Sequence, residues 1–306
     1  MRALALLVSL LLLAPATARA ETLHEALDAY VLYQSDVTAL LEAPIDGGDA
    51  IDAALERAAR HDPARVTRGW VAYGALTAAQ SPAFAAGVQS RVRAAGRAPV
   101  LRQLRRDLTY ARRRPPGAAQ AIQLVLASTA ADSARMTEAS ARYEQIGRSL
   151  DAATWLASSE RGAREERLRR IGGMSLSAEQ SARVRIGPLA ASPLTDADAF
   201  GGRRFWDALG GRASVATPAR TWREGGATTV DRMLTLGALA IMGADNGESV
   251  RVEALLDEPR TRACLALEQL QFRQCASVAH DASEDAFCLA RHGLAAPGAC
   301  FGGLAQ

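Results

Sequence analysis

The chain has 306 residues, of which 49% are hydrophobic, 23% charged and 5% aromatic, and its formal net charge is +3. This apolar content excludes general disorder, and the near-neutral balance excludes general nucleic-acid binding, which depends on a large positive charge. Few aromatics together with abundant alanine, leucine, arginine and glutamate favour helices over sheets.

The first 20 residues have the three-part pattern of an export signal. Arg2 gives a positive start, a short apolar run follows over residues 3–14, and Ala18 and Ala20 supply an A-x-A cleavage pattern. The run is well short of the roughly 20 apolar residues that a membrane-spanning helix needs. We expect cleavage near Ala20, which leaves a soluble periplasmic or extracellular chain. The two arginines of the segment leave with it, so the formal charge falls from +3 to +1.

After the signal, proline and glycine divide the chain into segments with helical periodicity. Apolar residues predict helices over 22–42 and 49–60. Proline is favoured at the first position of a helix, so an Asp-Pro and a Ser-Pro pair indicate two helix starts. The expected breaks are Pro44 with Gly47-Gly48, Asp62-Pro63, Ser81-Pro82, Gly96 to Pro99, and Pro115-Pro116-Gly117.

A longer seam of apolar or small residues runs from Ile122 to Leu150. The residues recur at alternating steps of three and four, with Asp132 as an interruption, and predict a long helix. A dimeric coiled coil is one interpretation of such a seam. The alanine-rich positions and Gly147 favour packing inside a bundle instead.

The helical pattern lapses over residues 187–226, which contain proline, glycine pairs, tryptophan and arginine. A loop of this length is uncommon unless it is functional. We expect a helical bundle over 21–186, an irregular loop or linker over 187–226, and a C-terminal helical segment over 227–306. The apolar stretch from Met233 to Ala244 is too short to span a membrane and predicts a buried core helix.

The four cysteines constrain the C-terminal segment most closely. Cys264 and Cys275 are 11 residues apart, a separation that returns to nearly the same face of a helix. A turn over residues 280–283, with Ser283 capping the next helix, would fold Cys288 back onto that face. The predicted fold class is therefore all-α: a multi-helix bundle with a long irregular Gly/Pro/Trp/Arg loop and a disulfide-stapled C-terminal helical hairpin.

The cysteine pairing follows from the geometry of an antiparallel hairpin, in which paired residue numbers have a constant sum. The numbers of Cys275 and Cys288 sum to 563, and those of Cys264 and Cys300 to 564. We predict these two disulfides among the three connectivities that four cysteines allow. Pro297 and the glycine after it place Cys300 on a tail rather than on a continuous helix.

Zinc binding is the alternative use of these cysteines, because His280 and His292 lie among them. Close C-x₂₋₄-C pairs are absent, however, and an exported chain meets oxidants first. A redox-active pair is disfavoured because the sequence has no C-x-x-C. No metal site and no cofactor is predicted.

The strongest ligand-binding candidates lie in the irregular region. They combine flat aromatic rings with guanidinium groups on a glycine-rich backbone, a set that suits an anionic or sugar-like ligand. The alternative is that the aromatic rings pin the loop to the bundle while the arginines stay in solvent. These candidates are Arg203, Arg204, Trp206, Trp222 and Arg223.

A second feature is a run of arginines, which could meet an anionic envelope polymer or an acidic envelope protein. The alternative is that it matches the acidic residues of the N-terminal region across the fold. The arginines are Arg91, Arg93, Arg97, Arg102, Arg105, Arg106, Arg112, Arg113 and Arg114, and the acidic residues are Glu42, Asp46, Asp49, Asp52 and Glu56.

Catalytic motifs are not found: the sequence has no G-x-S-x-G, H-E-x-x-H, phosphate-binding loop or dinucleotide fingerprint. His24 and His61 each stand alone on an expected helix. The sequence therefore predicts a binding or structural component of the cell envelope, more readily than an enzyme. The alternative is an envelope enzyme or small-ligand receptor that uses the arginine and tryptophan loop near residues 200–225.

Overall fold

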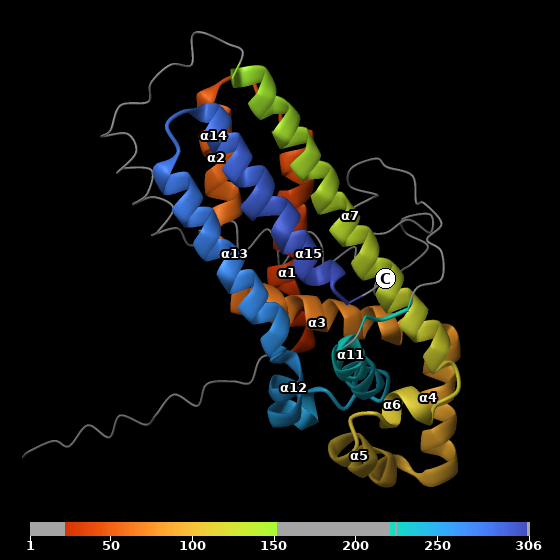
Figure 1. Cartoon of the computed structure of the whole chain (residues 1–306). Coiled ribbons are helices and arrows are strands. Elements are labelled where there is room, and N and C mark those ends of the chain that lie inside the picture. Colours follow the sequence, from red (N-terminus) through yellow and green to blue (C-terminus); the bar gives the residue numbers. More distant parts are fainter. Residues whose placement is uncertain (1–21, 152–220, 224, 305–306) are drawn as a thin grey trace, which may run out of the picture.

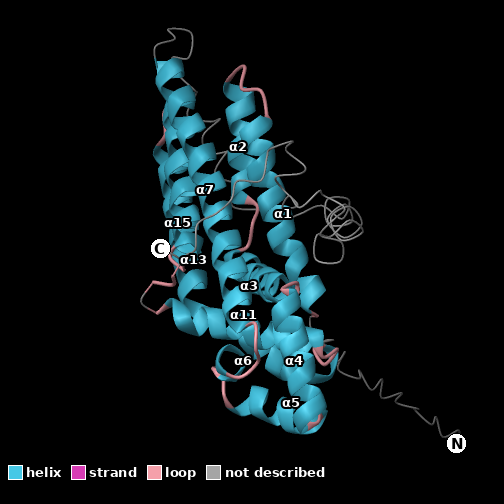
Figure 2. Ribbon diagram, turned by 90° about the vertical axis from the view of Figure 1, so that its right-hand side faces the viewer, coloured by secondary structure: helices cyan, strands magenta, loops and turns pink. Residues whose placement is uncertain are grey.

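The computed structural model describes residues 22–151, 221–223 and 225–304. Every regular element in these ranges is a helix, as Figure 2 shows, so the all-α prediction is confirmed. Of the predicted irregular region 187–226, only residues 221–223 and 225–226 belong to the described part.

The N-terminal half forms seven helices, and the predicted breaks separate them. One break is narrower than expected, because Gly96 alone separates two helices. Pro99 lies in the first turn of the second of them, where a backbone N–H has no partner within the helix, so proline is tolerated there. The helices are α1 (Leu23–Glu42), α2 (Gly48–Ala59), α3 (Pro63–Ala79), α4 (Pro82–Ala95), α5 (Arg97–Arg106), α6 (Tyr110–Arg113) and α7 (Ala118–Asp151).

Side-chain caps define where three of these helices begin. Thr22 and Glu25 form a reciprocal capping box at the start of α1. Asp62 accepts the N–H of Arg65 at 2.8 Å, and proline follows it at the first position of α3. Ser81 caps α4 in the same way. The Asp-Pro and Ser-Pro pairs are thus helix starts, as predicted.

Helix α3 lies at the centre of the fold and packs against both α1 and α11 (Gly226–Ile241). In Figure 1 it crosses below the long upright helices. Two glycines allow this close approach. A Cβ on Gly69 would lie 2.7 Å from the backbone of Ala26 and Tyr30 in α1, and a Cβ on Gly237 would lie 2.7 Å from the carbonyl oxygen of Ala75. A larger residue at either glycine would force the helices apart.

An aromatic group joins α1, α3 and the C-terminal helix α15 (Ala296–Gly302) in the core. Tyr30 lies 5.4 Å from Tyr73 and 5.6 Å from Phe301 between ring centroids, and Trp70 lies 5.4 Å from Phe301. Edge and tilted contacts of this kind add to the burial free energy of each ring. Helix α15 is therefore held in the same core as α1 and α3.

Helix α7 runs along the whole upper bundle in Figure 1 and packs against α1, α3, α15 and the two helical segments that precede α15. Its seam residues Val125, Met136 and Tyr143 are fully buried within the chain. The interpretation of this seam as a bundle contact is confirmed. Asp132, which interrupts the seam, is also fully buried, and it hydrogen bonds to Tyr30 of α1.

The C-terminal part adds further helices to the same core. The apolar stretch from Met233 lies largely within α11 and is buried, as predicted. In the ranges that the structure describes, no helix has both the length and the apolar character needed to cross a membrane. The elements after α11 are η2 (Asn246–Glu248), α12 (Ser249–Leu256), α13 (Pro259–Val278), α14 (Ala282–Cys288), the π-helical η3 (Leu289–Ala295) and α15.

Both predicted disulfides are present. Cys264 and Cys300 are joined with their Cα atoms 5.8 Å apart, and Cys275 and Cys288 with theirs 5.5 Å apart. They clamp α13 against the run formed by α14, η3 and α15, which lies alongside it (Figure 1). The nested pairing and the antiparallel hairpin are confirmed, and the interpretation of these cysteines as zinc ligands is wrong.

Two details of the hairpin differ from the prediction. Asp281, not Ser283, caps α14, because its extended backbone lets the carboxylate accept the N–H groups of both Ser283 and Glu284. Cys300 lies on a helix rather than on a tail. The wider π-helical turn of η3 ends just before Pro297, so this proline falls in the first turn of α15 and the helical run continues through it.

Candidate functional site

The arginine run is partly matched within the fold. Arg105 pairs with Glu248, and Arg112 Nε lies 2.7 Å from Asp231 Oδ1. Arg97 donates to carbonyl groups just after α11. The alternative in which the arginine run pairs with the N-terminal acidic residues is wrong for these three arginines. Helices α5 and α6 lie at the lower end of the molecule in Figure 1, whereas α2 lies at the upper end.

The predicted ligand loop lies only in part within the described chain. Arg203, Arg204 and Trp206 fall outside the described residues. Trp222 is half-buried beneath the guanidinium group of Arg112, whose Cζ atom is 5.5 Å from the ring centroid. The side chain of Arg223 is exposed, and its backbone N–H donates to the carbonyl of Leu304 at 3.1 Å.

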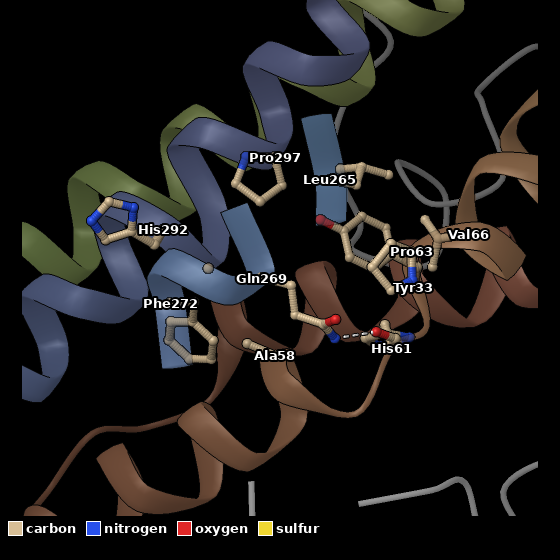
Figure 3. A pocket seen from close by; sticks show the side chains of 11 residues that line it. Tyr33, Ala58, His61, Pro63, Val66, Leu265, Gln269, Phe272, His292 and Pro297 are labelled. Atoms are coloured by element: carbon tan, nitrogen blue, oxygen red, sulfur yellow. Dashed lines mark hydrogen bonds between the residues drawn. The ribbon is translucent and has the colours of Figure 1, made fainter. Parts of the chain in front are cut away.

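A small pocket with a cavity volume of about 40 Å³ opens to solvent between α13, η3 and the connection from α2 to α3 (Figure 3). Its polar lining comes from Tyr33, His61, Gln269 and His292. The remaining walls are mostly apolar and include Pro63, Val66, Leu265, Phe272 and Pro297. Such a combination of apolar walls with a few polar groups is typical of small-molecule sites.

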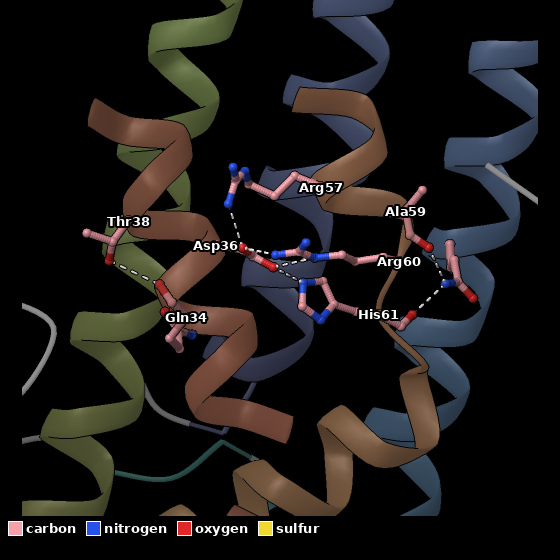
Figure 4. A network of polar contacts seen from close by, with 8 residues as sticks. Gln34, Asp36, Thr38, Arg57, Ala59, Arg60 and His61 are labelled. Carbon is pink, nitrogen blue, oxygen red and sulfur yellow. Dashed lines mark hydrogen bonds and ion pairs between the residues drawn. The ribbon is translucent and has the colours of Figure 1, made fainter. Parts of the chain in front are cut away.

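His61, which lines this pocket, also belongs to a polar cluster centred on α1 (Figure 4). Asp36 of α1, whose side chain is only 5% exposed, is its centre. The carboxylate lies 2.7 Å from His61 Nε2, 2.8 Å from Arg60 Nε and 2.9 Å from Arg57 Nη1. Gln269 of α13 donates to the backbone carbonyl of His61 at 2.6 Å. This hydrogen bond joins the connection between α2 and α3 to the C-terminal helical hairpin.

The local sequence explains why these groups converge. Arg57 lies in the last turn of α2, Arg60 is its C-cap, and His61 occupies the short link before the Asp62 cap of α3. The end of α2 and this link bring all three basic side chains to one face of α1. The cluster was missed from the sequence, where Asp36 is not near them and only the dense Arg-x-x-Arg-His pattern before a helix start could have indicated it.

The environment of Asp36 sets its charge. Burial alone would raise the pKa of this carboxyl, but the hydrogen bonds and charges of His61 and Arg60 outweigh burial and bring the pKa below its usual range. The folded-state pKa is therefore lower than the unfolded value of about 3.9. It follows that Asp36 stabilises the fold above about pH 4 and loses this effect as the pH falls through the folded-state pKa.

We expect Asp36→Asn to lower the free energy of unfolding by about 2 kcal/mol at pH 7, because charge-assisted hydrogen bonds are lost. The difference between the two proteins should shrink steadily below about pH 4, where the wild-type carboxyl also becomes neutral. Urea unfolding of both proteins from pH 7 to pH 2 measures this difference. An equal difference at every pH would contradict the proposed role of the charge.

Each histidine of the pocket has one ring nitrogen held by a carboxylate. In the neutral ring of His61, Nε2–H donates to Asp36 and Nδ1 is left as an acceptor. His292 Nδ1 lies 3.3 Å from Glu268 Oε2. The carboxylate therefore holds this nitrogen of His292 and not its Nε2. Burial, with a smaller effect of Asp36, raises the pKa of Tyr33, so its phenol stays protonated. The pocket thus has oriented hydrogen-bonding groups.

These groups can bind a molecule through hydrogen bonds and apolar contact. The described residues that line the pocket include no serine, cysteine or carboxylate that could act as a nucleophile. Within the described chain, no three histidine, cysteine or acidic side chains are grouped as metal ligands would be. The arrangement can hold a molecule by apolar contact and orient it through imidazole and amide groups.

Comparison with known proteins finds no matching family model, no matching curated protein and no matching solved structure.

Proposed function

We propose that this protein is an exported binding component of the cell envelope. The signal-like first 20 residues and the two disulfides support export, because disulfides form and persist in oxidising compartments. An envelope protein or an anionic envelope polymer remains the proposed partner of its surface. The histidine pocket is the proposed site for a small ligand.

The proposal of a ligand site rests on one observation: two imidazole rings line the same pocket, and a carboxylate holds each of them. A carboxylate that holds one ring nitrogen fixes the orientation of the ring and thus the direction of its other nitrogen. Fixing these rings before binding reduces the side-chain entropy that the protein loses when a ligand binds. We propose a ligand with an apolar body and at least one hydrogen-bonding group, in keeping with the walls of Figure 3.

Filling the pocket tests this function. Ala58 lines the pocket from α2, whereas Ala53 of the same helix is exposed and lies outside the lining. We expect Ala58→Leu to reduce the amount of ligand retained by at least about tenfold, since a leucine occupies the space that the ligand needs. Ala53→Leu, the matched control, should retain as much as wild type.

The measurement uses immobilised protein incubated with a solvent extract of the envelope fraction, and mass spectrometry quantifies the molecules retained after washing. A molecule retained by wild type and Ala53→Leu but not by Ala58→Leu supports the proposal. Equal retention by all three proteins, or retention by none, contradicts it. Circular dichroism establishes that Ala58→Leu is folded.

A further inference from the structure

A second hollow lies beside the Cys264–Cys300 disulfide, where α11 and α13 begin. It has a cavity volume of about 220 Å³, and Trp70 of α3 forms part of its wall. Arg223, a residue of the predicted ligand loop, lies at its edge, because its N–H donates to the carbonyl of Leu304, which lines the hollow. The hollow is separate from the histidine pocket and shares no lining residue with it.

One buried polar group on the wall of this hollow lacks a partner within the described residues. Trp70 is only 1% exposed, and its Nε1–H has no hydrogen-bond partner in residues 22–151, 221–223 or 225–304. Thr229 and Thr261 line the same hollow and carry hydroxyl groups. Since buried polar groups in proteins are almost always hydrogen bonded, this lining indicates a polar ligand.

Two opposite charges also line the hollow, the buried carboxylate of Glu258 and the exposed guanidinium group of Arg260. Glu258 is 3% exposed, and its carboxylate accepts the backbone N–H groups of Arg260 and Thr261 at 3.3 and 2.7 Å. The guanidinium group of Arg260 lies against Gly225, so closely that a Cβ there would overlap it. Within the described chain, neither Glu258 nor Arg260 pairs with any charged group, including each other.

The start of α11 adds positive potential next to Arg260. Gly225 is the N-cap of this 16-residue helix and offers no side chain to its free N–H groups. A helix N-terminus carries a partial positive charge, so it and the exposed guanidinium group of Arg260 together favour an anion at this edge of the hollow. Thr229, one turn into α11, can donate its hydroxyl hydrogen to the same anion.

From these groups we infer that the hollow binds a small zwitterion of the α-amino acid class. Its carboxylate lies between the start of α11, Arg260 and the Thr229 hydroxyl, and its ammonium group pairs with Glu258. This arrangement compensates both charges at once. A simple anion in the hollow would be repelled by the buried Glu258 carboxylate, and a simple cation would be repelled by Arg260 and the helix start.

Titration calorimetry with the full-length oxidised protein tests the inference. The probes are L-alanine, L-glutamate, L-lysine and L-phenylalanine, together with N-acetyl-L-alanine, which lacks the ammonium group, and L-alanine amide, which lacks the carboxylate. We expect at least one amino acid to bind. Removal of either charge, tested with the alanine derivatives or the corresponding derivatives of the amino acid that binds best, should weaken affinity at least about tenfold.

Variants locate the site. Arg260→Gln should weaken amino-acid binding at least about tenfold, and Thr229→Val, which keeps the shape but loses the hydroxyl, by about threefold to tenfold. Arg262→Gln is the matched control, because Arg262 is an exposed arginine of the same helix that pairs with Asp257 and does not line the hollow. Thermal unfolding shows which variants are folded.

Several outcomes would overturn the inference: no binding of any of the four amino acids, equal affinity for an amino acid and its amide, or an equal loss in Arg262→Gln and Arg260→Gln. Ala58→Leu distinguishes this site from the histidine pocket, because it should leave amino-acid affinity unchanged. The two proposals therefore fail independently.

Discussion

Replacing Arg135 by methionine is expected to lower the free energy of unfolding by about 3–5 kcal/mol, the usual cost of removing one partner from a buried ion pair. Arg135 Nη1 lies 3.1 Å from Asp132 Oδ1, and the two side chains are only 4% and 0% exposed. The same nitrogen lies 3.1 Å from Gln34 Oε1. Methionine retains most of the apolar stem but provides no positive charge for Asp132.

The network around Arg135 explains the size of this effect. Tyr30 donates to Asp132 at 3.1 Å and accepts from Gln34 at 3.0 Å, so the buried groups of α1 and α7 depend on one another. Burial, together with the charge of Asp132, raises the pKa of Tyr30, which keeps its phenol as a hydrogen donor. Loss of the arginine therefore disturbs the whole contact between the two helices.

Urea unfolding followed by circular dichroism measures the change. Arg148→Met is the matched control, since Arg148 is an exposed arginine of the same helix, and it should alter stability by less than about 0.5 kcal/mol. The double variant Asp132→Asn with Arg135→Met should lose less than the sum of the two single losses, because no buried charge then remains uncompensated. A loss below about 1 kcal/mol for Arg135→Met would show that this ion pair is not needed for stability.

Removing the disulfides should have the second large effect. The Cys264–Cys300 bridge links residues 36 apart in the sequence and the Cys275–Cys288 bridge links residues 13 apart. From loop-closure entropy, we expect a loss of about 4 kcal/mol for Cys264→Ser with Cys300→Ser and about 3 kcal/mol for Cys275→Ser with Cys288→Ser. Denaturant unfolding without reductant measures both losses, and the reverse order of the two losses would contradict the loop-entropy explanation.

The oxidation state of the same four cysteines tests whether the chain is exported to an oxidising compartment. With the full chain, material recovered outside the cytosol should contain no thiol that reacts with an alkylating reagent before reduction, and four after it. A chain that lacks residues 2–20 and stays in the cytosol should contain four reactive thiols. Four free thiols in exported material, or a linkage of Cys264 to Cys275, would contradict the nested pairing.

The sequence was most informative where structure depends on neighbouring residues. The Asp62 and Ser81 caps with their following prolines could be recognised because a cap needs only a few consecutive residues. The disulfide pairing could be predicted because regular helical spacing converts sequence distance into position along a hairpin. The errors there were also local: two residues near the turn could both cap α14, and the π-helical turn that precedes the helix of Cys300 has no sequence signal that we used.

Contacts between distant segments were decided only by the tertiary structure. Asp36 and His61 lie on different elements, and their 2.7 Å contact exists because α3 crosses α1 closely at Gly69. Likewise, Trp70 and Thr229 come together only when α11 packs on α3. Helical periodicity shows which face of a helix is buried but not which other helix covers it. The sequence alone therefore determined the helices and their covalent clamp, whereas packing determined both candidate sites.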